Sequence, residues 1–271
     1  QIQSMIFLRS LALRQRGGAG YPFLPKLLAL EAMAFAAPVT VFVGENGSGK
    51  STLLEALACA LRLPAIGADD TAQDATLASV RPLADALKLT FSRKARHGFF
   101  LRAEDFFGFT RRISQMQRDL RAELARVEEE YRDRSAFTQG QAKMAFASSL
   151  AELNARYGVD PDARSHGESF LSLFASRIQP GGLYLLDEPE SPLSPTSQLA
   201  LMAMLMDRES DCQFILATHS PILMAYPGAQ IWSFDAEPPQ IVPYEDLENI
   251  QLMRDFLNQP DRYIARLRNC E

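Results

Sequence analysis

Apolar and polar positions along the chain follow two different periods. Short, nearly continuous apolar runs, typical of strands buried on both faces of a parallel sheet, occur at 39–43, 182–186 and 212–217. Apolar residues at helical spacing lie between them, at 53–58 and 198–206. The alternation of buried strands with amphipathic helices predicts an α/β fold with a mainly parallel sheet.

Weaker patterns complete the expected architecture, which includes an antiparallel β portion at the amino-terminal end and a closing pair of strands. Segment 27–35 predicts a strand or a short helix, and the small, acidic stretch 64–75 predicts a surface loop. The other expected strands are 2–13, 87–91, 98–101, 231–234 and 240–242, and the expected terminal helices are 248–257 and 262–267.

The middle of the chain changes character. Apolar residues recur every three or four positions over 113–131 and again over 146–157, with a polar break between the two stretches. This pattern predicts a helical hairpin inserted into the α/β unit. We expect a core of residues 1–107 and 170–271 and a helical lobe of residues 108–169. The lobe is either a simple cover for the core or an arm for a partner or DNA.

Composition and charge narrow the class of protein. The chain is 47% hydrophobic and 23% charged, which is ordinary for a soluble globular protein. Its net charge of −5 gives no overall attraction to nucleic acid, although a local basic patch is compatible with it. Cys59, Cys212 and Cys270 form no metal-binding pair. Without a membrane-spanning apolar run or a signal-peptide pattern, the expected location is the cytoplasm.

The residues after 39–43 carry the strongest chemical signal. They fit the phosphate-binding pattern G-x-x-x-x-G-K-[ST] between a predicted strand and a predicted helix. Glycines let backbone N–H groups form a nest for phosphate oxygens, and the helix N-terminus adds partial positive charge. Lys50 is expected to reach the β- and γ-phosphates, and Ser51 to offer a hydroxyl to Mg²⁺. The stretch is Gly44-Glu45-Asn46-Gly47-Ser48-Gly49-Lys50-Ser51, followed by Thr52.

Two further predicted strands end in polar residues. Asp187 and Glu188 follow 182–186, and neighbouring side chains of a strand face opposite ways. We expect Asp187 to serve Mg²⁺ through its water shell and Glu188 to act on the attacking water. His219 follows 212–217, and the carboxyl ends of the strands in one sheet converge on the ligand crevice, so His219 is expected near a γ-phosphate. The alternatives are a plain strand-ending turn and a structural histidine.

A serine- and glycine-containing segment opens another apolar helix. It is Ser165-His166-Gly167-Glu168-Ser169, and such a helix start can bind an anion. If it belongs to the helical lobe, it cannot fold onto the phosphate loop of its own chain. This geometry implies a second molecule.

Taken together, these motifs occur in the order of the ABC-type ATPases, and the chain resembles that class. The phosphate loop and residues 187–190 look most like its SMC, RecF and OLD side. Segments 165–171, 100–104 and 217–223 resemble a family of short, stand-alone bacterial AAA/ABC-type ATPases, over a region from about Tyr21 to the carboxyl terminus.

The resemblance implies ATP and Mg²⁺ as ligands and a head-to-tail homodimer with two ATP molecules between the chains. The signature segment of one chain, with Ser165 and Gly167 at the γ-phosphate and Glu168 and Ser169 beside them, would complete the site of the other. Arg9 looks like the phosphate-touching arginine of the first strand in SMC-like heads.

Some positions depart from the pattern of the class. Glu104 stands where a metal-contacting glutamine is usual, and 191–194 lacks the aspartate common in transporters. Tyr21 and Phe23 are weak candidates for stacking on adenine.

The resemblance favours an ATP-hydrolysing, dimerising switch that acts in DNA maintenance or phage defence, with a separately encoded effector or DNA as partner. The alternative is the ATP-binding subunit of an ABC membrane transporter, against which stand Glu45, Asn46 and the missing glutamine. A nucleotide-binding regulator with negligible turnover is a third reading. The neighbouring genes would separate these functions.

Overall fold

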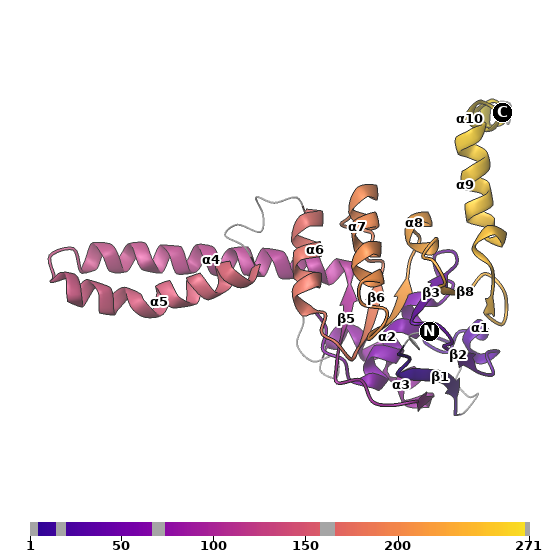
Figure 1. Cartoon of the computed structure of the whole chain (residues 1–271), viewed down its shortest axis with the longest axis horizontal. Coiled ribbons are helices and arrows are strands. Elements are labelled where there is room, and N and C mark those ends of the chain that lie inside the picture. The colour runs from indigo at the N-terminus through magenta and orange to yellow at the C-terminus, as the bar shows by residue number, and fades with distance from the viewer. Residues whose placement is uncertain (1–4, 15–19, 67–73, 158–165, 269–271) are drawn as a thin grey trace.

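The computed structural model describes residues 5–14, 20–66, 74–157 and 166–268. Figure 1 shows a core of strands and covering helices, from which a long helical hairpin projects on one side and the last two helices project near the carboxyl terminus. The hairpin consists of α4 (Ala103–Glu130) and α5 (Ala136–Tyr157). The prediction of two helices with a break between them is confirmed, but both helices begin ten residues before the apolar stretches, at Ala103 and Ala136.

The larger sheet of the described chain has six strands in the order β5–β6–β7–β3–β8–β9. Neighbouring strands are parallel, except that β9 pairs antiparallel with β8. The α/β fold with a mainly parallel sheet is therefore confirmed. The strands are β3 (Val39–Val43), β5 (His97–Arg102), β6 (Gly182–Asp187), β7 (Gln213–Ala217), β8 (Gln230–Ser233) and β9 (Gln240–Ile241).

Helices cover both faces of this sheet, because successive residues of a strand point to opposite sides. Val41 packs in a cluster with residues of α6 (His166–Arg177), α7 (Pro195–Met206) and α8 (Pro221–Met224). The next residue, Phe42, packs in a second cluster with α2 (Lys50–Leu61), η1 (Ala75–Val80) and α3 (Arg81–Ala86). Burial on both faces explains why the strands read as continuous apolar runs.

The smaller sheet forms the expected antiparallel portion. Its strand order is β2–β1–β4, with β1 (Leu8–Leu13), β2 (Met33–Ala34) and β4 (Leu87–Phe91). Gln213 on β7 ties this sheet to the larger one. Its Oε1 accepts hydrogen bonds from the N–H groups of Phe7 and Leu8 at 2.9 and 2.8 Å, and its Nε2 donates to the Leu8 carbonyl at 2.9 Å.

Several predicted boundaries are wrong. The first strand begins at Leu8 rather than Ile2, although residues 1–4 lie outside the described chain. Segment 27–35 divides between α1 (Pro25–Leu28) and β2. Ala65 and Ile66, expected in a surface loop, are buried because Ala65 bridges to Phe100 at the edge of β5. Sequence periodicity also missed the short helices α3 and α8.

The carboxyl-terminal part forms η2 (Tyr244–Asp246), α9 (Glu248–Asn258) and α10 (Pro260–Arg268). Ile250 anchors α9 in the core, whereas most of the residues that follow it are exposed. The expected terminal helices are confirmed.

Candidate nucleotide-binding site

The phosphate loop connects the buried strand β3 to the first turn of α2. Its glycines adopt backbone angles that other residues avoid, with φ of 142° at Gly44 and 101° at Gly49. A Cβ atom on Gly44 would lie 3.0 Å from Asp235 Oδ1, and one on Gly49 would lie 2.9 Å from Leu24 Cδ1. The positive φ angles therefore favour glycine at both positions, and a Cβ atom would also displace the neighbouring side chains of Asp235 and Leu24.

Lys50 lies in the interior of this loop and is only 4% exposed. Its Nζ donates hydrogen bonds to the carbonyl oxygens of Gly44 at 2.7 Å and Glu45 at 2.9 Å. Burial lowers the pKa of Lys50, and the carboxylates of Asp235 and Asp187 oppose this effect. The ammonium group is thus held inside the concave side of the loop, where a phosphate would meet the backbone N–H groups.

Ser51 and Asp187 bring α2 and the end of β6 together. The Ser51 hydroxyl donates a hydrogen bond to Asp187 Oδ1 at 3.0 Å, across 136 residues of sequence. Burial raises the pKa of Asp187 to about 7, with smaller contributions from Glu55 and Glu188. A buried carboxylate beside a hydroxyl is the oxygen-rich set of donors that Mg²⁺ prefers. These two residues therefore fit the metal-binding role predicted for them.

Glu188 and Glu190, which follow β6, contact residues at the end of the adjacent strand β7. Glu188 has a φ of 48°, which is unfavourable for a non-glycine residue, and its N–H donates to the Ala217 carbonyl at 2.8 Å. Glu190 Oε1 accepts a hydrogen bond from the backbone N–H of His219 at 2.6 Å. Glu188 and His219 thus lie at the same end of the sheet, where β6 and β7 terminate, and the Glu190 carboxylate holds the backbone of His219 in place.

The loop has a partner that sequence reasoning missed. Asp235 Oδ1 accepts a hydrogen bond from the Glu45 N–H at 2.8 Å, and Lys26 Nζ donates to the carbonyl oxygens of Phe234 at 2.7 Å and Asp235 at 3.1 Å. Asp235 lies two residues beyond β8, which pairs with β3. The convergence of strand ends that singled out His219 applies equally to Asp235 and was a usable signal.

The structure does not bring the remaining predicted residues to this loop. Arg9 is exposed on β1, and no described contact joins its side chain to the phosphate loop. Ser165 lies outside the described residues, as do the side chains of His166 and Glu104. Tyr21 is 56% exposed and Phe23 is half-buried, on the segment that reaches Gly49 through Leu24.

The described part of the signature segment lies at the start of α6. Gly167 is buried, and a Cβ atom on it would lie 3.3 Å from the Pro192 carbonyl and from Ser197 Oγ. Glu168 is exposed and Ser169 is half-buried. The amino-terminal end of α6 therefore packs beside the loop 191–194 and the first turn of α7.

A phosphate loop between a parallel strand and a helix, with an aspartate at the end of another strand of the same sheet, defines the class of P-loop nucleotide-binding folds. Comparison with family models gives the particular family. Residues 74–225, more than half of the 271-residue chain, match "AAA domain, putative AbiEii toxin, Type IV TA system", and residues 29–97 match a second AAA-domain model. The chain belongs to the first of these families of AAA domains.

The solved structures that resemble this chain are distant from it in sequence. The SMC head domain from Thermotoga maritima is 16% identical, with a TM-score of 0.44 over 88% of this chain and 99% of that one. The Smc head domain from Pyrococcus furiosus is 13% identical, with a TM-score of 0.45 over 94% and 99%. A nucleotide-free ATP-binding cassette from an ABC transporter is 16% identical, with a TM-score of 0.45 over 88% and 90%.

No curated protein matches the chain. Within the described residues, no helix combines the length and apolar character needed to cross a membrane.

Proposed function

We propose that this protein binds and hydrolyses ATP and works as a switch that dimerises head-to-tail around two ATP–Mg²⁺ molecules. The observation that supports the proposal most directly is the hydrogen bond of 3.0 Å from the Ser51 hydroxyl to Asp187 Oδ1, together with the burial of Lys50. Membership of an AAA-domain family supports ATP as the ligand.

Each residue has a separate task in this proposal. Lys50 exchanges the carbonyls of Gly44 and Glu45 for phosphate oxygens. Ser51 and Asp187 hold Mg²⁺, which neutralises phosphate charge when bound. Glu188 orients and deprotonates the attacking water, and His219, from the neighbouring strand, contacts the γ-phosphate.

The position of α6 supports the dimer. A Cβ atom on Gly167 would lie 3.3 Å from the Pro192 carbonyl and from Ser197 Oγ, so the start of α6 packs against the loop 191–194 and α7. A serine and glycine at a helix start can bind an anion. The signature segment is therefore assigned to the γ-phosphate of a second chain, with Ser165 and Gly167 as its contacts.

DNA maintenance or phage defence is the proposed setting, with a separately encoded effector or DNA as partner. The description of the matched family names a toxin of a type IV toxin–antitoxin system, which fits a defence role. Glu45 and Asn46 of the phosphate loop favour this setting over membrane transport.

Glu188→Gln tests the proposal, because it keeps the shape of the side chain but removes the base. This variant should bind ATP–Mg²⁺, lose at least about a hundredfold in hydrolysis rate and accumulate as a dimer. Light scattering should give twice the mass of one chain with ATP–Mg²⁺ and a single-chain mass with ADP.

Lys50→Ala is the control, and it should lose ATP binding and stay monomeric. A Glu188→Gln protein that binds ATP–Mg²⁺ and remains monomeric would contradict the dimeric switch. ATP binding by Lys50→Ala with unchanged affinity would contradict the nucleotide site itself.

A further inference from the structure

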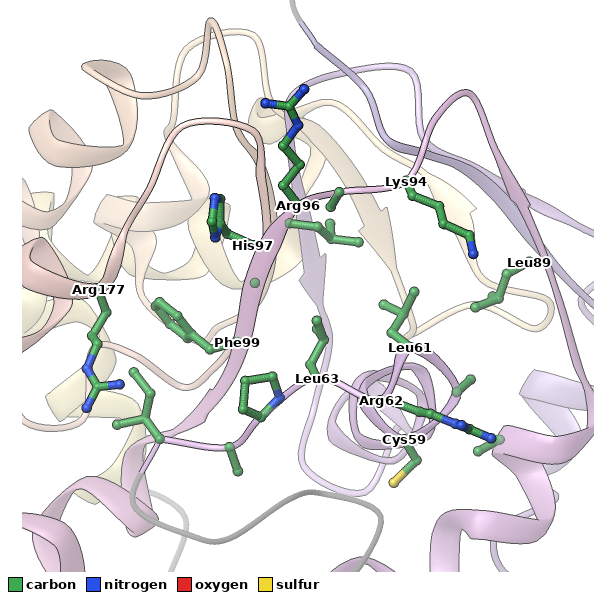
Figure 2. Close-up of a pocket in the computed structure, with 18 of the residues that line it drawn as sticks. Cys59, Leu61, Arg62, Leu63, Leu89, Lys94, Arg96, His97, Phe99 and Arg177 are labelled. Carbon is green, nitrogen blue, oxygen red and sulfur yellow. The ribbon is translucent and has the colours of Figure 1, made fainter.

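A second concave site lies away from the phosphate loop, around the first residues of the edge strand β5. Its volume is about 1710 Å³. Its walls come from the carboxyl-terminal end of α2, the loop before β5, β4 and the beginning of α4. Figure 2 shows Arg177 on one side of β5, with Lys94 and Arg62 on the other. We refer to this concavity as the β5 cleft.

The lining of the β5 cleft is strongly basic, although the chain carries a net charge of −5. Asp85 is the one carboxylate among the described residues that line it. The lining cations come from six separate parts of the described chain, one of them Arg81 of α3, so folding gathers them. They include Arg14, Arg62, Lys94, Arg96, Arg112 and Arg177.

Most of these cations have no ion-pair partner within the part of the chain that the structure describes. Within the described residues, no ion pair involves Arg62, Lys94, Arg96 or Arg112, and all four are exposed. In contrast, Arg126 and Arg132 of the hairpin each pair with a glutamate. Like charges around one concavity repel each other, so a bound anion would stabilise them.

Size and surface indicate what kind of anion fits. Pockets for small molecules usually hold about 300–1,000 Å³, so this cleft suits a segment of a polymer. Apolar side chains line the same cleft, among them Leu63, Leu89 and Phe91, the last of which is 39% exposed. A single-stranded nucleic acid carries a phosphate and a flat, largely apolar base at every nucleotide, and a cleft lined by both cations and apolar or aromatic side chains suits both groups.

We propose that the β5 cleft binds single-stranded nucleic acid, with arginine and Lys94 side chains on the phosphates and Phe91 under a base. Arginine predominates among the cations, and its planar group can donate two hydrogen bonds to one phosphate. The inference deepens the proposed function by naming its partner, and it rests on that function only for its biological setting, since binding at the cleft requires no ATP.

The test measures fluorescence anisotropy of a labelled oligothymidylate of about 16 nucleotides, without ATP, between about 50 and 200 mM salt. A triple variant, Arg62→Gln, Lys94→Gln and Arg96→Gln, removes three cations of the cleft. The matched control, Arg254→Gln, Arg262→Gln and Arg266→Gln, removes three exposed cations of α9 and α10.

The wild type and the control triple should bind the oligonucleotide with affinities within about twofold, whereas the cleft triple should bind at least about tenfold more weakly. The slope of log affinity against log salt should fall by about 2 in the cleft triple, because each lost phosphate contact contributes about 0.7 for a single strand. Phe91→Ala should weaken binding with little change in that slope.

A circular dichroism spectrum and a thermal unfolding midpoint close to those of the wild type show that each variant is folded. Equal binding by the cleft triple and the wild type would overturn the proposal, as would no binding at the lowest salt. Tighter binding of polyglutamate than of the oligonucleotide would assign the cleft to an acidic protein segment instead. The failure of ATP-dependent dimerisation leaves this assay unaffected, so the two proposals fail separately.

Discussion

At the residue scale, the candidate site contains two ionisable side chains, Asp187 and Lys50, whose charged forms are disfavoured by burial. Asp187 is 8% exposed and its pKa is raised to about 7, chiefly because burial penalises the ionised form. Lys50 is buried nearby and its pKa is lowered for the same reason. The site is therefore less stable on its own than a neutral core would be, which is typical of functional sites.

Asp187→Asn should stabilise the protein in the absence of nucleotide. The asparagine can keep an acceptor for Ser51 and carries no charge to bury. One pKa unit corresponds to about 1.4 kcal/mol, and a value of about 7 against the ordinary 3.8 gives an upper limit of about 4 kcal/mol. Thermal unfolding at pH 8 should show a higher midpoint for the variant, together with a loss of Mg²⁺-dependent ATP hydrolysis.

The stability gained by Asp187→Asn should depend on pH. A carboxyl group with a raised pKa favours the folded state below pH 4, and this contribution is lost as the pH rises towards about 7. The difference between the variant and the wild type should therefore be small at pH 4, grow up to pH 7 and then level off. A variant less stable than the wild type at pH 8 would contradict the burial argument.

At the element scale, Arg102 joins the phosphate-loop helix to the hairpin. It is 5% exposed at the end of β5, opposite Asp187 in the parallel register. Its guanidinium forms ion pairs with Glu55 of α2 at 3.3 Å, Asp74 before η1 at 3.3 Å and Asp105 of α4 at 2.7 Å. The buried guanidinium of Arg102 thus pairs with three carboxylates from three separate segments of the chain.

Arg102→Leu should be strongly destabilising. Removing one side of a buried ionic cluster leaves the other charges unpaired, at a cost of about 3–5 kcal/mol. Urea unfolding followed by circular dichroism should show a clearly lower midpoint. Arg126→Leu is the matched control, because Arg126 pairs with Glu123 at 2.7 Å but is 70% exposed, and it should cost at most about 0.5 kcal/mol. Equal midpoints for the two variants would refute a structural role for the cluster.

At the scale of the whole molecule, the signature segment and the phosphate loop belong to different surfaces of one chain. The start of α6 packs beside α7, on the opposite face of the sheet from α2. The composite site that we propose would therefore need two chains that exchange these surfaces in a closed, two-fold arrangement.

Mixing two inactive variants tests this exchange. Lys50→Ala should lose ATP binding, and Ser165→Arg should bind ATP but neither dimerise nor hydrolyse it. A mixed dimer has one site with an intact Lys50 and an intact partner signature. An equimolar mixture should regain up to about half of the wild-type hydrolysis rate, since neither variant dimerises with itself and each mixed dimer has one working site out of two.

Each variant alone must remain inactive in the same assay. A mixture no more active than its components would count against a shared site. Full activity of Ser165→Arg by itself would remove the signature segment from the reaction.

The sequence alone determined the elements whose signals are local. The phosphate loop needs glycines, a lysine and a serine at fixed spacing, and strands buried on both faces need continuous apolar runs, so both were predicted from residues 39–52. Asp187 and the hairpin were predicted for the same reason. The family resemblance added expectations for Arg9, Glu104 and Ser165 that stay predictions.

Only the tertiary structure decided contacts between residues far apart in sequence. Three such contacts join segments that no periodicity in the sequence relates. They are the hydrogen bond between Asp235 and Glu45, the hydrogen bonds of Gln213 to the beginning of β1, and the ion pairs of Arg102. The β5 cleft is basic although the chain as a whole is acidic, because folding gathers distant cations at one place. Local patterns fix which element forms, whereas the packing of elements fixes which side chains meet.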